Sequence, residues 1–124
     1  DVDRVLDALR LMRRASLLIR ELEAYFARHD LSQLRFLMMI LIDREPERNC
    51  LAASEIAERL DVSRPVVTRT LQGLERAGLI AISENSEDAR SRNVTLTLSG
   101  KAKLDEVLPG YFAILHRPDP AADK

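Results

Sequence analysis

Hydrophobic residues recur at helical spacing over the first 28 residues of the chain. They are Val5, Leu6, Leu9, Met12, Leu18, Ile19, Leu22, Tyr25 and Phe26. A spacing of three to four residues predicts one long amphipathic helix from Val2 to about Arg28. Its apolar stripe is wide for a single neighbouring element. Two interpretations stay open: the helix is buried within its own domain, or it also packs against a second subunit.

A second helix is predicted from about Ser32 to Arg44, with Asp30 or Ser32 as its N-cap. Residues 34–42 are apolar nearly all round, which is typical of a helix at the centre of a core. After a loop, Cys50 and Leu51 predict a very short strand.

Two further helices are predicted on either side of a three-residue turn. Residues 53–60 carry apolar side chains on one face, and residues 61–63 form the turn. The next helix, residues 64–77, begins after Ser63, a favoured N-cap, and stops at Gly78, a favoured C-terminal cap. This order of helix, short turn and helix is typical of a helix-turn-helix.

A hairpin and a last helix complete the pattern. Residues 79–82 and 94–98 read as its two strands, and the polar segment 83–93 as its tip. Ser99 is the expected cap of a helix that Pro109-Gly110 interrupts. The fold class predicted from this order is mainly α (α+β), a winged helix-turn-helix.

Composition narrows the class of protein. The 124 residues are 46% hydrophobic and 31% charged, with a net charge of −1, which is typical of a globular protein and argues against binding nucleic acid through bulk charge alone. The longest apolar run, residues 36–42, is far too short to span a bilayer. A single cysteine and no visible signal peptide favour the cytoplasm. The sequence begins at Asp1 and not at a methionine, which is compatible with a piece of a longer protein.

The predicted helix 64–77 has an outward face suited to DNA. At 100° per residue, Val67, Leu71 and Leu74 fall on one side of it. The candidate DNA contacts lie at the start of this helix or on its other side. They are Ser63, Arg64, Pro65, Thr68, Arg69, Gln72 and Arg76. Arginine can clamp guanine and glutamine can clamp adenine in the major groove. Residues 62–103 hold seven Lys and Arg against four acidic residues, a local charge of +3, which leaves −4 for the remainder.

Two stretches of the sequence resemble the motifs of a known family. Ser54-Glu55-Ile56-Ala57 with Ser63-Arg64-Pro65-Val66-Val67-Thr68-Arg69 resembles the helix-turn-helix of the MarR family of bacterial transcriptional regulators. Residues 87–97, with Asp88 and Arg90 ahead of Val94-Thr95-Leu96-Thr97, are similar to the wing of that family. Together these motifs cover about residues 51–104.

The resemblance implies roles for matching residues. Arg90 would enter the minor groove from the wing tip, with Arg92 nearby, and Asp88 would hold the wing in shape. Ala89 stands where many members carry another arginine. Residues 1–30 and 99–116 would be dimerisation helices around a DNA-binding lobe at residues 51–98, with 117–124 a disordered tail. The family usually ends in a longer helix than this chain, where His116-Arg117-Pro118 curtails it. The residues expected to form the dimer contact are Val5, Leu9, Met12, Leu104, Leu108 and Phe112.

Other functions have less support. The histidines are isolated, no catalytic grouping is suggested, and no Cys/His pair has zinc spacing, so no enzyme, cofactor or metal is expected. Cys50 is either a peroxide sensor or a small buried hydrophobe. The main alternative is a winged helix used for protein–protein contact in a larger assembly. The resemblance also implies a small aromatic or anionic effector and repression of a pseudo-palindromic operator. Tyr25, Phe36, Met38 and Met39 are either pocket-lining or core residues.

Overall fold

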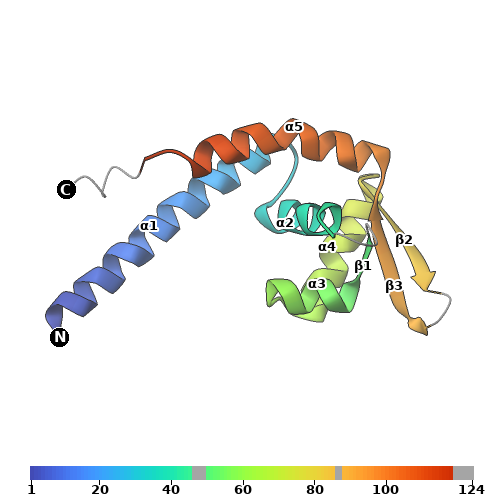
Figure 1. Ribbon diagram of the computed structural model, residues 1–124, viewed down its shortest axis with the longest axis horizontal. Helices are drawn as coiled ribbons and strands as arrows, with labels where there is room; N and C mark the ends of the chain where they lie inside the picture. The colour runs from blue at the N-terminus through green and yellow to red at the C-terminus, as the bar shows by residue number, and fades with distance from the viewer. Residues whose placement is uncertain (46–49, 86–87, 119–124) are drawn as a thin grey trace. The chain divides into compact units, whose positions relative to one another are not determined.

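The computed structural model describes the backbone of residues 1–45, 50–85 and 88–118, and the side chains of these except residues 84–92. The chain forms two compact units (Figure 1). Unit 1 comprises Asp1–Gln33 and Pro109–Lys124, and unit 2 comprises Leu34–Leu108. The predicted lobe, residues 51–98, therefore lies within unit 2. None of the helices in the described ranges is both long enough and apolar enough to cross a membrane.

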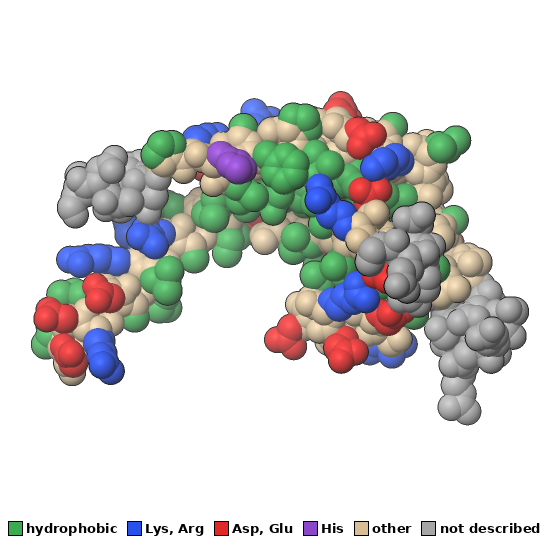
Figure 2. Space-filling view, in the orientation of Figure 1, with side chains coloured by type: hydrophobic (Ala, Val, Ile, Leu, Met, Phe, Trp, Pro, Cys, Tyr) green, Lys and Arg blue, Asp and Glu red, His purple; other side chains and the backbone are tan. Residues whose placement is uncertain are grey.

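Unit 1 is built on helix α1, Val2–Ala27, close to the predicted range. The side chain of Asp1 caps it by accepting the backbone N–H of Asp3 at 3.0 Å. Near its other end, the ring of Phe26 stacks on that of Tyr111, with centroids 5.9 Å apart. Phe26 is fully buried, whereas most of the apolar residues in the first 19 positions of α1 are exposed (Figure 2).

Three consecutive helices each contribute buried side chains to unit 2. Helix α2, Gln33–Asp43, buries Phe36, Met38, Met39 and Ile42. Helices α3, Ala53–Leu60, and α4, Arg64–Arg76, match the predicted helix-turn-helix. Asp61 between them has a φ of 52°, a left-handed conformation that aspartate tolerates better than most residues.

The sheet of unit 2 has the strand order β1-β3-β2 and is antiparallel. Strand β1 spans Cys50–Ala52, β2 Ile80–Asn85 and β3 Asp88–Leu96. The predicted winged helix-turn-helix is thus confirmed. Both hairpin strands extend into the segment predicted as a polar tip, because backbone hydrogen bonds of an antiparallel ladder do not require apolar side chains.

Helix α5 corrects two predictions. It runs without interruption from Leu98 to Leu115, with Pro109 inside it. Its cap is Thr97 and not Ser99, since the Thr97 Oγ1 accepts the backbone N–H of Gly100 at 3.0 Å. Proline removes one helical hydrogen bond, but buried side chains before and after it, such as Val107 and Ile114, hold the helix on both sides.

Candidate nucleic-acid interface

The two faces of α4 are sharply different. Val67, Leu71 and Leu74 are buried against unit 2, as predicted. The exposed residues on or before α4 include all seven candidate contacts: Ser63, Arg64, Pro65, Thr68, Arg69, Gln72 and Arg76. The structure therefore leaves each of these side chains accessible on the helix that follows the turn.

The start of α4 is fixed locally. Ser63 is the N-cap and accepts the backbone N–H of Val66 at 3.5 Å, and Pro65 lies in the first turn, where it costs no hydrogen bond. The hydroxyl of Thr70 donates to the carbonyl oxygen of Val66 at 2.8 Å, so this hydroxyl hydrogen-bonds to the backbone of its own helix. The positive end of the helix dipole makes this terminus favourable for a phosphate.

A hollow of about 310 Å³ adjoins the exposed face of α4. It lies between the start of α3, α4 and the two hairpin strands, and its lining residues are Ala52, Ala53, Ser54, Arg64, Thr68, Leu71, Gln72, Glu75, Ile82 and Val94. Sequence reasoning missed Ser54 and Glu75 as members of this surface. The spacing of Glu75, which is three residues after Gln72 and seven after Thr68, is the signal that could have placed it there.

The wing residues Asp88, Arg90 and Arg92 belong to β3, but their side chains lie outside those the structure describes. The backbone places them by register: Arg92 pairs with Glu84 of β2 and Asp88 with Asn85, with an irregularity between Glu84 and Asn85. The roles expected for these three residues therefore stay predictions.

Two lysines of the basic segment, residues 62–103, form ion pairs with carboxylates outside the exposed face of α4. The Lys101 ammonium donates to Asp43 at 2.9 Å and lies 3.6 Å from Asp105. The hydrogen bond with Asp43 raises the pKa of Lys101, with further contributions from both carboxylates. Lys103 lies 3.8 Å from Glu106. The charge available to an anion on the described part of this segment is therefore concentrated on Arg64, Arg69 and Arg76 of α4.

The residues predicted for dimerisation differ in their exposure. Val5, Leu9 and Met12 are more than half exposed on α1, at 57%, 55% and 65%, and Phe112 is also exposed. Leu108 is half-buried, and the side chain of Leu104 is fully buried within unit 2. A side chain that fills the core of its own unit is not exposed to a second copy, and the role expected for Leu104 in dimerisation stays a prediction.

Comparison with known proteins identifies the family. The family model described as the MarR family matches residues 29–91, slightly more than half of the chain. The chain belongs to the MarR family. It is 38% identical over 93 residues to the HTH-type transcriptional repressor YetL of Bacillus subtilis, an alignment that covers 74% of this chain and 54% of YetL. The chain spans about half or less of the length of the curated relatives it matches.

Solved structures of MarR-family proteins share the fold. A transcriptional regulator, MOSR from M. tuberculosis, solved in complex with DNA, is 25% identical, with a TM-score of 0.72 and coverage of 87% of this chain and 76% of that one. Sco3205 from Streptomyces coelicolor, a MarR-family regulator, has a TM-score of 0.90 at 19% identity, with coverage of 99% and 80%. At this identity the second likeness supports the fold alone.

The apolar residues considered as pocket lining are mostly core residues in this MarR-family chain. Phe36, Met38 and Met39 are fully buried in unit 2, and Tyr25 is half-buried in unit 1. Cys50 is half-buried and has Thr95 of β3 as its neighbour in the strand register. The described residues contain no group of three or more His, Cys, Asp or Glu that could hold a metal ion.

Proposed function

We propose that this chain is the DNA-binding part of a sequence-specific transcriptional regulator that reads duplex DNA with α4. The observation that carries the proposal is the exposure of Arg64, Thr68, Arg69 and Gln72 on a helix whose Val67, Leu71 and Leu74 are buried. Relatives named as transcriptional repressors and a similar regulator solved with DNA support it. Membership in this family also argues against an enzyme.

The proposed DNA contacts fall into two kinds: those that bind phosphates and position the protein, and those that read the bases. Arg69 and Gln72, near the middle of α4, are suited to bidentate contacts with guanine and adenine. Ser63 and Arg64 lie at the helix start, where their side chains and the positive end of the helix dipole suit a phosphate. Arg90 of the wing is proposed to enter a narrow minor groove, where the negative potential is concentrated.

A second copy of the chain is proposed as the other partner. Val5, Leu9 and Met12 form an exposed apolar stripe on α1, and such unpaired patches usually mark an interface. A two-fold dimer would place two α4 helices in successive major grooves, roughly one helical turn apart, and the operator would be a pseudo-palindrome. We further propose repression in the cytoplasm, relieved by a small aromatic or anionic effector.

The test is a selection of bound sequences from random duplexes, followed by affinity measurements on the selected site. Arg69→Ala is expected to relax the sequence preference by roughly 1–3 kcal/mol, the cost of losing a bidentate base contact. Arg44→Ala is the matched control, because Arg44 is exposed in the same unit but lies in the turn after α2.

A selection that enriches no sequence at moderate salt would contradict the proposal. It would favour the alternative, a winged helix that contacts other proteins. That alternative does not require Arg69 and Gln72 to be exposed together, which is why DNA binding is the function proposed here.

A further inference from the structure

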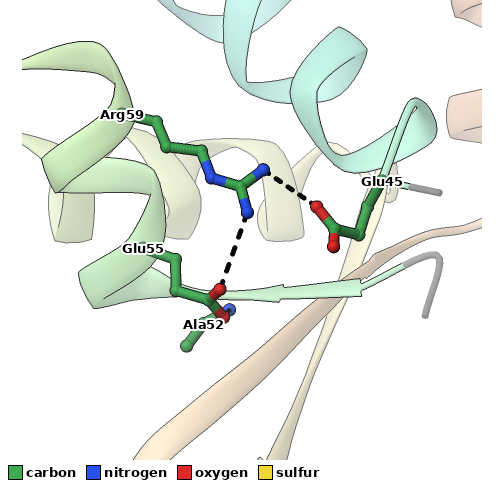
Figure 3. Close-up of polar contacts among 4 residues, drawn as sticks. All are labelled: Glu45, Ala52, Glu55 and Arg59. Atoms are coloured by element: carbon green, nitrogen blue, oxygen red, sulfur yellow. Dashed lines mark hydrogen bonds and ion pairs between the residues drawn. The ribbon is translucent and has the colours of Figure 1, made fainter. Parts of the chain in front are cut away.

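One carboxylate is buried in the described part of unit 2. Glu45 is only 8% exposed and lies two residues after the end of α2. Its Oε2 accepts a hydrogen bond from the Arg59 Nη1 at 2.8 Å (Figure 3). A buried charge is unfavourable unless it is paired, so Glu45 ties the end of α2 firmly to the last turn of α3.

The other end of the Arg59 guanidinium continues the network. Its Nη2 lies 3.8 Å from the Oε2 of Glu55, one helical turn earlier on α3. The second carboxylate oxygen of Glu55 accepts the backbone N–H of Ala52 at 3.1 Å, which caps the start of α3. Figure 3 shows the guanidinium between the two carboxylates, with Ala52 beneath Glu55.

Ala52 connects this network to the DNA-facing surface. It is the last residue of β1 and pairs with Asn93 of β3, one of the two strands of the wing hairpin. It also lines the hollow that Arg64 and Thr68 of α4 share. The network therefore joins four parts of unit 2: the end of α2, both ends of α3 and the end of β1.

We infer that Arg59 is a positioning residue for DNA recognition, acting through Glu45 and Glu55. It holds α3 and the end of β1 in the arrangement that lets α4 and the wing engage one duplex together. The inference rests on the proposed DNA-binding function. The competing explanation is direct contact, because the Arg59 side chain is 42% exposed and could itself bind a phosphate.

Three variants test the inference. Arg59→Ala removes the bridge between the two carboxylates. Glu45→Gln keeps the shape of the Glu45 side chain but removes its charge. Arg59→Lys keeps a positive charge, but an ammonium group cannot contact both carboxylates as the planar guanidinium does. Each is measured for affinity to the selected site and to a random duplex over a range of salt, with urea unfolding in parallel. The matched controls are Arg44→Ala and Glu58→Gln, since Glu58 is exposed on α3.

The expected result is a loss of specificity with an unchanged salt dependence. Arg59→Ala and Glu45→Gln should each lower affinity for the selected site roughly tenfold, within the range of couplings inside one ion-pair network. Affinity for the random duplex and the slope of log affinity against log salt should stay near the parent values, because no phosphate contact is lost. Arg59→Lys should lose less affinity than Arg59→Ala.

Three outcomes would overturn the inference. A salt slope lowered by about one in Arg59→Ala, with Glu45→Gln like the parent, would mean that Arg59 contacts a phosphate. Equal losses on both duplexes would mean that the bridge only stabilises the fold, because unfolding lowers the active fraction for every ligand alike. Unchanged affinities would remove any role. If Arg59→Ala does not fold, Glu45→Gln and Arg59→Lys decide. A parent that selects no DNA would instead overturn the proposed function.

Discussion

Gly100, in the first turn of α5, lies directly against the carbonyl group of Leu79. A Cβ at position 100 would overlap the Leu79 oxygen and lie 2.9 Å from its carbonyl carbon. That oxygen accepts the backbone N–H of Thr97 at 3.1 Å, and the Thr97 hydroxyl donates to the carbonyl oxygen of Gly78 at 2.6 Å. The end of α4 and the start of α5 are therefore joined at a close backbone approach.

Gly100→Ala is expected to destabilise the protein strongly. The obstructing atoms belong to backbone that is already hydrogen-bonded, so the clash is relieved only by moving α5 or Leu79, at about 1–3 kcal/mol or more. Urea unfolding measures this loss. Ser99→Ala is the control, since Ser99 is exposed and is not the cap of α5, and it should change stability by less than about 0.5 kcal/mol. Equal effects of the two substitutions would contradict the close approach.

Gly73 of α4 and Arg35 of α2 should be energetically coupled. A Cβ at position 73 would overlap the Arg35 guanidinium and lie 3.1 Å from its Cζ, but this is the end of a flexible side chain. Gly73→Ala therefore combines a gain in helix propensity of about 1 kcal/mol with displacement of Arg35. In an Arg35→Ala background only the gain remains, so Gly73→Ala should be more stabilising there. A double-mutant cycle by urea unfolding measures the difference, and strictly additive effects would disprove the contact.

The Lys101 ion pair should contribute to stability at neutral pH and lose its effect in alkaline solution. The hydrogen bond with Asp43 raises the pKa of Lys101 in the folded state, so folding favours the protonated form. The contribution is fully present below the pKa of an unfolded lysine, and it disappears as the pH rises through the raised value. NMR titration of the Lys101 side chain should show a lower pKa in Asp43→Asn. Asp105→Asn should lower it less, and the reverse order would refute this assignment.

Leu9→Glu should weaken self-association without unfolding unit 1. Leu9 is 55% exposed in one copy, so a charge there costs little in the monomer, whereas an interface would bury it unpaired. Light scattering should show a dimeric parent. The variant should have a dimer dissociation constant at least roughly tenfold higher than that of the parent. Ala24→Glu adds the same charge at an exposed position of α1 away from Val5 and Met12, and should stay dimeric. A monomeric parent would contradict the proposed dimer, and an unaffected variant would place the interface elsewhere.

Much of the candidate interface could be predicted from the sequence because it depends on short-range order. Helix α3 begins and ends where the pattern placed it, at Ala53 and Leu60. The burial of Leu71 and Leu74 and the exposure of Thr68 and Gln72 follow from a period of 3.6 residues. The cap at Ser63 needs only the three residues that follow it.

The remaining features depend on residues far apart in the chain, and only the tertiary structure decided them. Pro109 reads locally as a helix break, yet α5 continues through it because buried side chains on both sides hold the helix. Leu104 has the spacing of an interface residue but fills the core of unit 2. Glu45 and Arg59 are 14 positions apart, and no periodic pattern relates them. The sequence by itself determined the helices and the outward face of α4, since neighbouring residues fix them. Packing determined the rest, because which side chains are buried, paired or free depends on the surfaces that folding brings together.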